Sequence, residues 1–305
     1  MHMNKLTGKQ TDEGKNIVHN EVTMKKKTTA TVISQKNLAP GIFDMWLETE
    51  LAENAHAGQF VGVYTEDKSL LLPRPISICE VDHEKNAIRI VYRVAGRGTD
   101  EFSKYSAGEK VKLLGVLGNG YDIGKLLGKS VVLMGGGIGI PPMLELAKEI
   151  NAHNEALTDG DKMKISIVLG YRDSMTFLKE DFEKYGKVYI ASEDGSVGTQ
   201  GNVMNVMVSG GSDGEAEDKT ADNEDTVKAD IICACGPMPM LRAIKKFAEE
   251  KAIPAYISLE ERMACGVGAC LGCVVKTKEI DHHSHVNNAR ICTDGPVFLA
   301  SDVEI

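Results

Sequence analysis

The sequence predicts a β-barrel, then a doubly wound α/β domain, then a small cysteine-rich module. Three observations predict this order: short apolar runs separated by turn residues, strands that alternate with helical stretches, and four cysteines clustered near the carboxyl end. A chain of 305 residues is long enough for two ordinary domains. We expect domains at 28–127, 128–258 and 259–305, after a polar extension at 1–27 that is expected to be disordered.

Six runs of β-type residues make up the predicted barrel. They are short and separated by turn residues such as Pro40 and Gly41, with almost no helical periodicity, which is typical of a barrel or sandwich. The runs cover residues 29–34, 42–48, 59–64, 76–80, 87–94 and 110–115.

Strands and helices alternate in the second domain, which favours a parallel sheet. Strands are predicted at 130–134, 165–171, 187–192 and 231–234, and helices at 142–153, 176–185 and 240–251. An acidic stretch at about 209–230 interrupts this pattern, and we expect it to be a disordered insert. It holds eight acidic residues and two lysines. Most of the net charge of −9 therefore belongs to one loop and indicates nothing about a substrate.

Composition and charge exclude several classes of protein. A negative net charge argues against nucleic-acid binding, because phosphates attract lysine and arginine. The longest uncharged run, 130–143, contains four glycines and two prolines and does not predict a membrane-spanning helix. Residues 1–22 lack the apolar core of a signal peptide. Clustered cysteines without a secretion signal favour metal binding over disulfides, so we expect a cytoplasmic protein.

Four cysteines form the most specific motif. Their spacing is C-x4-C-x2-C followed, after eighteen residues, by one more cysteine, which matches the plant-type [2Fe–2S] pattern. Glycines between them suit a loop that turns its N–H groups toward sulfur. The candidate metal ligands are Cys265, Cys270, Cys273 and Cys292.

Zinc is the alternative metal for this motif. Three histidines, His282, His283 and His285, lie between the third and fourth cysteines and could complete a Cys/His zinc site, or they could form a solvated loop. Structural zinc usually takes paired C-x2–4-C knuckles, which this sequence lacks. Free thiols are the third interpretation.

A glycine-rich turn follows the first predicted strand of the α/β domain. It consists of Gly135, Gly136, Gly137 and Gly139, and a helix follows from Pro142. Such a turn brings N–H groups and the positive end of a helix dipole to a phosphate. The spacing is not G-x-G-x-x-G, which disfavours an ordinary Rossmann dehydrogenase. Close packing alone explains the glycines equally well at this point.

A further motif, Arg74-Pro75-Ile76-Ser77, lies within the predicted barrel and is ambiguous by itself. Together with the glycine turn and the segment Cys235-Gly236-Pro237-Met238 after the last strand, it resembles the ferredoxin–NAD(P) reductase superfamily. The run S-L-E-E-R-M-A-C-G-V-G-A-C-L-G-C, which ends at Cys273, is similar to the electron transfer subunits of class 1B dihydroorotate dehydrogenases. The resemblance extends from about Thr28 to the end of the chain.

Three features depart from this family pattern. They are the amino-terminal extension, the acidic insert and a longer interval before Cys292. The longer interval leaves only the loop between Cys273 and Cys292 in doubt, because Cys292 is the only cysteine after Cys273.

The resemblance implies a Greek-key barrel that binds FAD. Arg74 would contact the FAD pyrophosphate, although Arg93 is equally suited to a phosphate, and Ser77 would lie near the flavin N5. The residues implied at the FAD site are Arg74, Pro75, Ile76, Ser77, Val91, Tyr92, Arg93, Gly98 and Thr99.

The resemblance also implies that the α/β domain binds NAD. Cys235 matches a position near the nicotinamide, which makes it, with Ser77, a candidate catalytic residue; a buried hydrophobe is the alternative role for this cysteine. Glu193 and Asp194 follow the third strand, where carboxylates accept hydrogen bonds from ribose and repel a 2′-phosphate, or simply face solvent. We therefore expect NAD rather than NADP. The remaining implied contacts are Gly135, Gly136, Gly137, Gly139, Gly236 and Pro237.

The family's function completes the expectation. Electrons would pass from the FMN of a dihydroorotate dehydrogenase catalytic subunit through the [2Fe–2S] cluster and FAD to NAD, in pyrimidine (UMP) biosynthesis. The complex would contain two copies of each subunit, with neither nucleic acid nor membrane as a partner. One alternative is a flavoprotein subunit of another ferredoxin/NAD(P)H oxidoreductase or of a hydrogenase. A second, of a different class, is a zinc-stabilised nucleotide-binding regulator.

Overall fold

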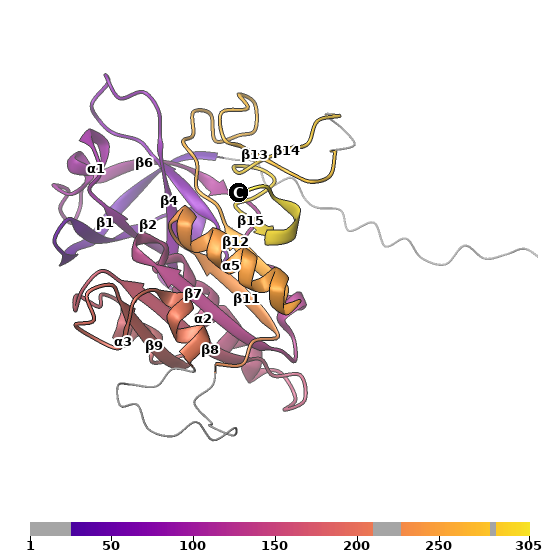
Figure 1. The fold of residues 1–305 in the computed structure, drawn as a ribbon. Coiled ribbons are helices and arrows are strands. Elements are labelled where there is room, and N and C mark those ends of the chain that lie inside the picture. Colours follow the sequence, from indigo (N-terminus) through magenta and orange to yellow (C-terminus); the bar gives the residue numbers. More distant parts are fainter. Residues whose placement is uncertain (1–25, 210–226, 281–284) are drawn as a thin grey trace, which may run out of the picture.

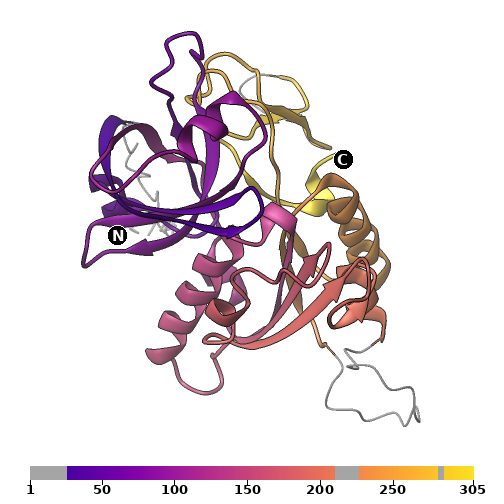
Figure 2. The same ribbon diagram turned by 90° about the vertical axis from the view of Figure 1, so that its left-hand side faces the viewer.

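The computed structural model describes residues 26–209, 227–280 and 285–305. A barrel and a helix-covered sheet lie side by side, and the carboxyl-terminal segment runs along both, as two perpendicular views show (Figure 1, Figure 2). The expected barrel and doubly wound domain are confirmed.

Six antiparallel strands close the barrel in the order β1-β2-β5-β4-β3-β6. The order is of Greek-key type, since β2 pairs with β5 and β6 pairs with β3. Closure leaves no unpaired edge. The strands are β1 (Lys26–Ala39), β2 (Ile42–Glu48), β3 (Phe60–Val63), β4 (Arg74–Asp82), β5 (Ala87–Arg93) and β6 (Lys110–Leu117).

Strand β1 begins earlier than the sequence predicts. Lys26 and Lys27 pair with Gly115 and Leu114 of β6, and the Lys27 ammonium lies 4.2 Å from the centre of the Tyr64 ring. Backbone pairing and this cation–π contact hold residues whose own side chains indicate disorder. Residues 1–25 of the predicted extension and 210–226 of the predicted insert lie outside the described part of the chain.

Aromatic side chains fill the barrel interior. Tyr92 is 1% exposed, and its ring meets that of Phe102 edge-on with centroids 6.1 Å apart. Phe102 ends helix α1 (Arg97–Phe102), which with the 3-10 turn η1 (Glu50–Asn54) was not predicted, because such short elements show no periodicity.

The sheet of the second domain has the order β10-β9-β8-β7-β11-β12-β15. All its neighbouring pairs are parallel except β12 and β15. The strand order reverses between β7 and β11, which is the place where doubly wound sheets bind ligands. The strands are β7 (Ser130–Gly136), β8 (Lys164–Tyr171), β9 (Lys187–Ser192), β10 (Thr199–Gln200), β11 (Ile231–Cys235), β12 (Ala255–Ser258) and β15 (Val297–Leu299).

Helices cover both faces of this sheet. Residues of α2 and α3 share one apolar core with the outer surface of the barrel, and residues of α4 and α5 form the core on the opposite face. The main helices are α2 (Pro142–Glu155), α3 (Lys179–Phe182), α4 (Val203–Ser209) and α5 (Met238–Lys251), and the 3-10 turns are η2 (Ile123–Leu126), η3 (Gly137–Gly139) and η4 (Ala300–Asp302).

The helix predicted at 176–185 is wrong at both ends, since α3 has only four residues. Leu178 precedes it with φ of 65°, a left-handed conformation that a continuing right-handed helix excludes. Within the described ranges, no helix combines the length and the apolar character that crossing a bilayer requires.

The carboxyl-terminal segment is held between the two domains. Strand β13 (Val274–Lys276) pairs with β14 (Asn288–Arg290) in a hairpin, and β15 then joins the edge of the sheet. At the other side, Gly266 packs on β6, since a Cβ there would lie 3.1 Å from Leu114 and 3.3 Å from Leu117. The cysteine-bearing loop therefore rests on the barrel.

A charge network joins the barrel to the α/β domain. The guanidinium of Arg89 on β5 donates two 2.9 Å hydrogen bonds to Asp44, and it also bonds Glu80 of the barrel at 3.2 Å and Asp181 of α3 at 3.1 Å. Although burial disfavours its charge, the hydrogen bonds to Asp44 raise the pKa of Arg89 above its usual range. The cation thus stays charged at the domain boundary.

Helix α2 makes a second set of polar contacts with the barrel. The Oε2 atom of Glu145 accepts a 2.7 Å hydrogen bond from the N–H of Val81, and Lys148 lies 3.3 Å from Glu80. Glu145 is 3% exposed. Burial raises its pKa from 4.5 to about 8, even though Lys148 and the Val81 N–H oppose the shift.

We predict that Glu145 makes the folded chain less stable as the pH rises. Between pH 4.5 and about 8 the folded chain keeps a proton that the unfolded chain has released. The free energy of unfolding should therefore fall across this interval, by at most about 1.4 kcal/mol per pH unit. Denaturant unfolding at several pH values measures this slope.

The variant Glu145→Gln should flatten the pH dependence across this interval. Glu155→Gln, at the exposed end of the same helix, is the matched control and should retain the slope. A slope that is the same in all three proteins would contradict the assignment to Glu145.

Candidate functional site

The start of β4 and the first turn of α1 lie against each other. A Cβ at Gly98 would lie 2.2 Å from Nε of Arg74, so the absence of a side chain at Gly98 leaves room for the guanidinium in this position. The Thr99 hydroxyl holds the turn by accepting the Ala95 N–H at 2.8 Å. Arg74 also donates to the carbonyl of Leu70 at 3.3 Å. The cation and the amide-rich turn together suit a phosphate.

The other residues of the R-P-I-S motif lie beside Arg74 and reach the surface. Ser77 pairs with Phe60 and Pro75 pairs with Gly62 on the neighbouring strand β3. Pro75 is exposed, Ile76 and Ser77 are partly exposed, and burial begins at the next residue. This end of β4 is therefore open to a ligand, whereas the rest of the strand is core.

The predicted residues of β5 separate into two environments. Tyr92 lies inside the barrel, where its hydroxyl bonds Gln35 at 2.9 Å, and Val91 is buried on the side of the α/β domain. Arg93 is exposed, and its guanidinium lies 3.4 Å from the position that a Cβ of Gly137 would occupy. The two arginines therefore occupy different places: Arg74 at the barrel turn and Arg93 at the glycine turn.

The two glycine turns of the α/β domain meet at the switch point. A Cβ at Gly139 would lie 2.4 Å from the carbonyl of Cys235 and 2.5 Å from the Gly236 nitrogen. A Cβ at Gly136 would lie 2.4 Å from the sulfur of Met240. Glycine is therefore required here for close packing of the turns. The packing also places their N–H groups at the carboxyl edge of the sheet, where nucleotides bind.

The remaining predicted residues of these turns are Gly135 and Pro237. Gly135, the residue before the last of β7, lies beside Ile140, whose Cα would be 2.8 Å from an added Cβ, and Pro237 directly precedes α5. Both are part of the contact between strand ends and helix starts.

Cys235 is buried with 1% exposure, and this burial raises the pKa of its thiol far above neutrality. The neighbouring Ser258 opposes the shift without reversing it. The thiol is thus neutral and suits a packing or contact role, while thiolate chemistry is disfavoured.

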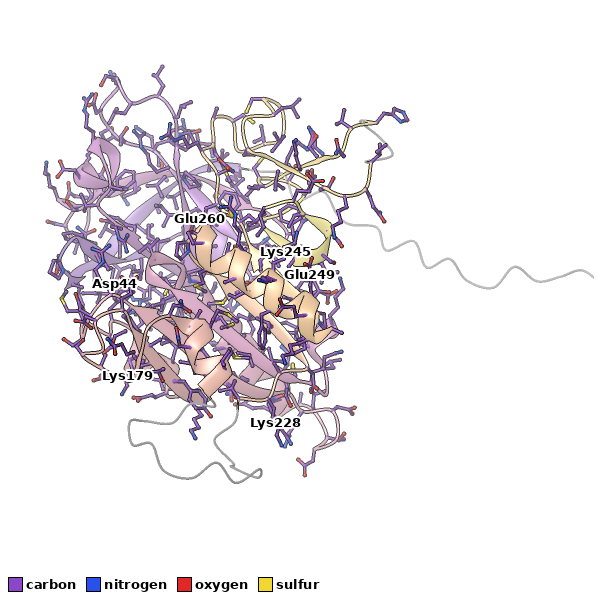
Figure 3. The ribbon with its side chains drawn as sticks, in the orientation of Figure 1. Asp44, Lys179, Lys228, Lys245, Glu249 and Glu260 are labelled. Carbon is purple, nitrogen blue, oxygen red and sulfur yellow. The ribbon has the colours of Figure 1, made fainter. Side chains whose placement is uncertain are left out.

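Glu260 is a candidate residue that the motif analysis overlooked. It follows β12 and lies near one end of α5, where the two domains meet (Figure 3). Its carboxylate is accessible to solvent, yet surrounding protein raises its pKa by desolvation, with Arg93 acting in the opposite direction. These properties are typical of a charged side chain in a cleft. Its place in the S-L-E-E-R-M run was the available signal.

Glu193 and Asp194 lie in the exposed turn that follows β9. The Glu193 N–H donates to Tyr171 at 3.1 Å, which places both acids at the same edge of the sheet as the glycine turns. Asp194 accepts the Ser196 N–H at 2.9 Å, so one of its oxygens shapes the turn. The Glu193 carboxylate is exposed beside it.

The first cysteines of the carboxyl-terminal motif already receive backbone hydrogen bonds. The sulfur of Cys265 accepts the Val267 N–H at 3.4 Å, and that of Cys270 accepts the Gly272 N–H at 3.4 Å. Burial disfavours the Cys265 thiolate, but hydrogen bonds from Val267 and Cys270 outweigh it and lower the thiol's pKa to about 6. A loop that stabilises thiolate suits iron coordination.

The β13–β14 hairpin closes the long interval before the last cysteine. Val274 pairs with Arg290, and the Ile291 N–H donates to the Cys273 carbonyl at 2.9 Å. Cys273 and Cys292 therefore lie at the same end of the hairpin, and both are buried. The hairpin thus brings the fourth cysteine close to Cys273 along the chain of backbone contacts.

The candidate ligands are all cysteines, which is the donor set that a two-iron cluster takes. In a [2Fe–2S] cluster each iron takes two thiolates, so the cysteines divide into two pairs. Across the described ranges, no three His, Cys, Asp or Glu side chains gather as a single metal ion requires. His282 and His283 lie outside the described residues.

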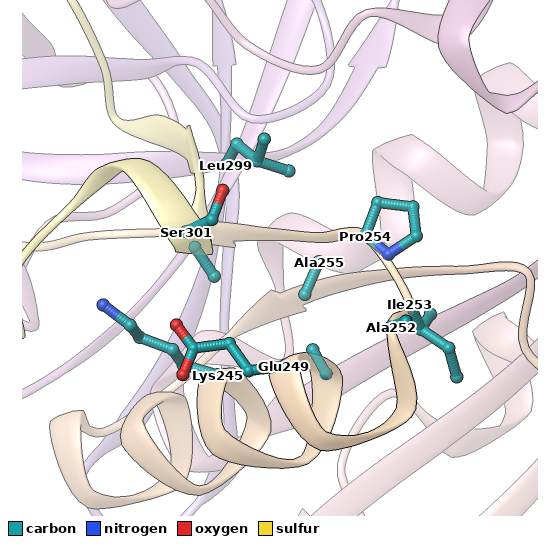
Figure 4. Close-up of a pocket in the computed structure, with 10 residues that line it drawn as sticks. Lys245, Glu249, Ala252, Ile253, Pro254, Ala255, Leu299 and Ser301 are labelled. Atoms are coloured by element: carbon teal, nitrogen blue, oxygen red, sulfur yellow. The ribbon is translucent and has the colours of Figure 1, made fainter. Parts of the chain in front are cut away.

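A cavity of about 260 Å³ lies apart from all of these residues. It lies between α5 and the strands β12 and β15, and its lining includes Lys245, Glu249, Pro254 and Leu299 (Figure 4). None of the predicted site residues lines it.

Two parts of the chain match known domain families. Residues 260–304 match the iron-sulfur cluster binding domain of dihydroorotate dehydrogenase B, and residues 133–246 match the oxidoreductase NAD-binding domain. The first match favours iron–sulfur over the zinc alternative.

The fold is also that of a known flavin enzyme. The chain superposes on the NADH-dependent reduced ferredoxin-NADP oxidoreductase with a TM-score of 0.73 at 24% identity, covering 90% of this chain and 89% of the other. This likeness concerns the fold alone.

Two relatives match almost the whole chain. The dihydroorotate dehydrogenase B (NAD(+)) electron transfer subunit of Streptococcus mutans is 40% identical over 280 residues, covering 91% of this chain and 98% of the relative. The corresponding subunit of Fusobacterium nucleatum is 38% identical over 279 residues, covering 90% and 97%. With such identity over nearly the full length of both proteins, the chain belongs to the family of dihydroorotate dehydrogenase B (NAD(+)) electron transfer subunits.

Proposed function

We propose that this chain carries electrons from dihydroorotate oxidation to NAD, as the electron transfer subunit of a dihydroorotate dehydrogenase in pyrimidine biosynthesis. The observation that carries the proposal is the packing of the four-cysteine loop on barrel strand β6, through Gly266 against Leu114 and Leu117. Strand β6 neighbours β3, and β3 neighbours β4, whose open end carries Ser77. Cluster and flavin sites are therefore two strands apart, at roughly 10 Å from strand spacing.

Each of the three domains has one cofactor in this proposal. Residues 28–127 hold FAD, 128–258 hold NAD and 259–305 hold the [2Fe–2S] cluster. FAD is required between the other two, because a cluster passes one electron at a time whereas nicotinamide exchanges a hydride. Arg74 and the Gly98–Thr99 turn bind the FAD phosphates, and Ser77 lies at the flavin. Arg93 and the two glycine turns face the nicotinamide nucleotide.

The partner is an FMN-bearing catalytic subunit that docks over the cysteine loop. Cys270 is exposed there, and Leu271 beside it is 60% exposed. An apolar surface next to an exposed thiolate suits a protein interface that excludes water from the cluster. We propose two copies of each subunit in the complex, and a cytoplasmic location, where thiols stay reduced. The other exposed apolar residues of this segment are Val267, Val274, Ile280 and Val286.

The cluster assignment predicts that Cys270→Ser loses iron. A hydroxyl is a poor substitute for thiolate, so iron and acid-labile sulfide per chain should fall severely. Chemical analysis and visible absorption of the purified variant measure this. Cys233→Ala, which alters a buried cysteine of β11 outside the motif, should keep its full content of iron and acid-labile sulfide. A complete cluster in Cys270→Ser would refute the assignment.

The acidic turn after β9 predicts a preference for NADH over NADPH. Glu193 repels a 2′-phosphate, so kcat/KM with an artificial acceptor should be higher for NADH. Glu193→Arg should lower the ratio of kcat/KM for NADH to kcat/KM for NADPH by about tenfold, equivalent to about 1.4 kcal/mol.

Glu155→Arg makes the same charge change at the far end of α2 and should leave the nucleotide ratio unaltered. Equal turnover of NADH and NADPH by the unmodified chain would contradict the role of the two acids.

The assignment of dihydroorotate oxidation to the FMN-bearing subunit predicts how the isolated chain behaves. It should pass electrons from NADH to an artificial acceptor but should not oxidise dihydroorotate, since the barrel and the α/β domain are assigned to FAD and NAD. Adding the FMN subunit should restore dihydroorotate-dependent reduction of NAD, followed by absorbance of NADH. Reduction of NAD by dihydroorotate with the isolated chain would show that the proposed division is wrong.

A further inference from the structure

We propose that Glu145 and Asp181 are positioning residues, which set the distance between the nicotinamide site of the α/β domain and the flavin site of the barrel. The inference rests on the proposed function. Neither residue belongs to a motif, and neither is among the individual residues that we assign to contact FAD, NAD or the cluster.

The first connection runs along strand β4. Ser77, at the flavin end of this strand, is four residues from Val81, which is roughly 13 Å along an extended chain. The N–H of Val81 donates to Glu145 at 2.7 Å. Val81 pairs with Ile88 of β5 and Ser77 pairs with Phe60 of β3, with a β-bulge between Ile78 and Glu80, so the continuous backbone of β4 links the Glu145 contact to Ser77.

The second half of this connection is helix α2. Glu145 lies in its first turn, and the helix begins at Pro142, three residues after Gly139 of the glycine turn. Met143, Leu144 and Leu146 are fully or almost fully buried, so the turn and the helix move together. One buried hydrogen bond therefore joins the strand that carries the flavin site to the helix that carries the nucleotide turn.

A second contact between the barrel and the α/β domain prevents the two domains from rotating about the first contact. Asp181 of α3 accepts a 3.1 Å hydrogen bond from Arg89 of β5. Two hydrogen bonds to Asp44 hold this guanidinium rigidly in the barrel. The same strand β5 ends at Arg93, beside Gly137. Two separate attachments between two bodies fix their relative orientation as well as their separation.

Hydride transfer is sensitive to this geometry. With both cofactors bound, NADH would give one hydride, two electrons with one proton, to the flavin with no other reactant, which is the reverse of the proposed flow to NAD and passes through the same geometry. Reacting atoms must approach to about 3–3.5 Å, and a misplacement of about 1 Å costs up to about a hundredfold in rate. Residues that orient the domains should therefore affect the rate of hydride transfer more than the affinity for NADH.

The test uses the full chain loaded with FAD and cluster. NADH is mixed anaerobically with the protein, and flavin bleaching gives a limiting rate and an apparent dissociation constant. The long-wavelength charge-transfer absorbance reports how closely nicotinamide and flavin stack. Hydrogen–deuterium exchange of the peptide around Val81, before NADH is added, reports the contact without any turnover.

Glu145→Ala and Asp181→Ala should each lower the limiting rate roughly tenfold or more, with an unchanged dissociation constant and a weaker charge-transfer band. Exchange at Val81 should rise in Glu145→Ala. Glu145→Gln keeps an oxygen that can accept the Val81 N–H. It should therefore restore the limiting rate, the charge-transfer band and the protection of Val81 from hydrogen exchange. The control Glu155→Gln should behave as the unmodified chain.

The inference is wrong if both alanine variants keep the rate and the charge-transfer band, or if only the dissociation constant rises. Should Glu145→Ala fail to fold, Asp181→Ala decides, because the Asp181 carboxylate is 29% exposed and Arg89 keeps its hydrogen bonds to Asp44 and Glu80 without it. An unmodified chain that lacks FAD, or whose flavin NADH does not bleach, would instead overturn the proposed function.

Discussion

The contact between helix α2 and barrel strand β4 is the constraint on which the rest of the structure depends. Apolar residues of α2 and of the outer barrel surface, such as Leu146 and Val91, belong to one continuous core. Burial of the apolar surface in this shared core drives the two domains together. Buried polar groups are stable there because each has a partner: Glu145 with the Val81 N–H, and Arg89 with Asp44.

The docked arrangement determines where the three cofactor sites lie. Strand order places β6 beside β3 and β3 beside β4, so the cysteine loop on β6 is close to the open end of β4. At the domain boundary Arg93 reaches the glycine turn through Gly137. The proposed sequence of sites, cluster then flavin then nicotinamide, agrees with the electron-count requirement that a flavin stands between one-electron and two-electron carriers.

Regular elements with strong periodicity were predictable from sequence. The ranges of β2 and β9 agree with the prediction at both ends. Prediction failed where tertiary contacts overrule local pattern. Lys26 joins the barrel because β6 supplies its backbone partners, and α3 is short because Leu178 is left-handed. Strand β15 was missed because three residues show no period, although they complete a sheet edge.

The sequence by itself determined the chemistry. The cysteine spacing, the R-P-I-S motif and the glycine turns identify the cofactors, because coordination and phosphate binding depend on residue types at short spacings. Only the tertiary structure decided which distant residues meet. It separates Arg74 from Arg93, joins Gly139 to Cys235, and connects Glu145 to Val81, 64 residues away. Local sequence carries no signal of such contacts, because they arise when one shared core brings separate elements together.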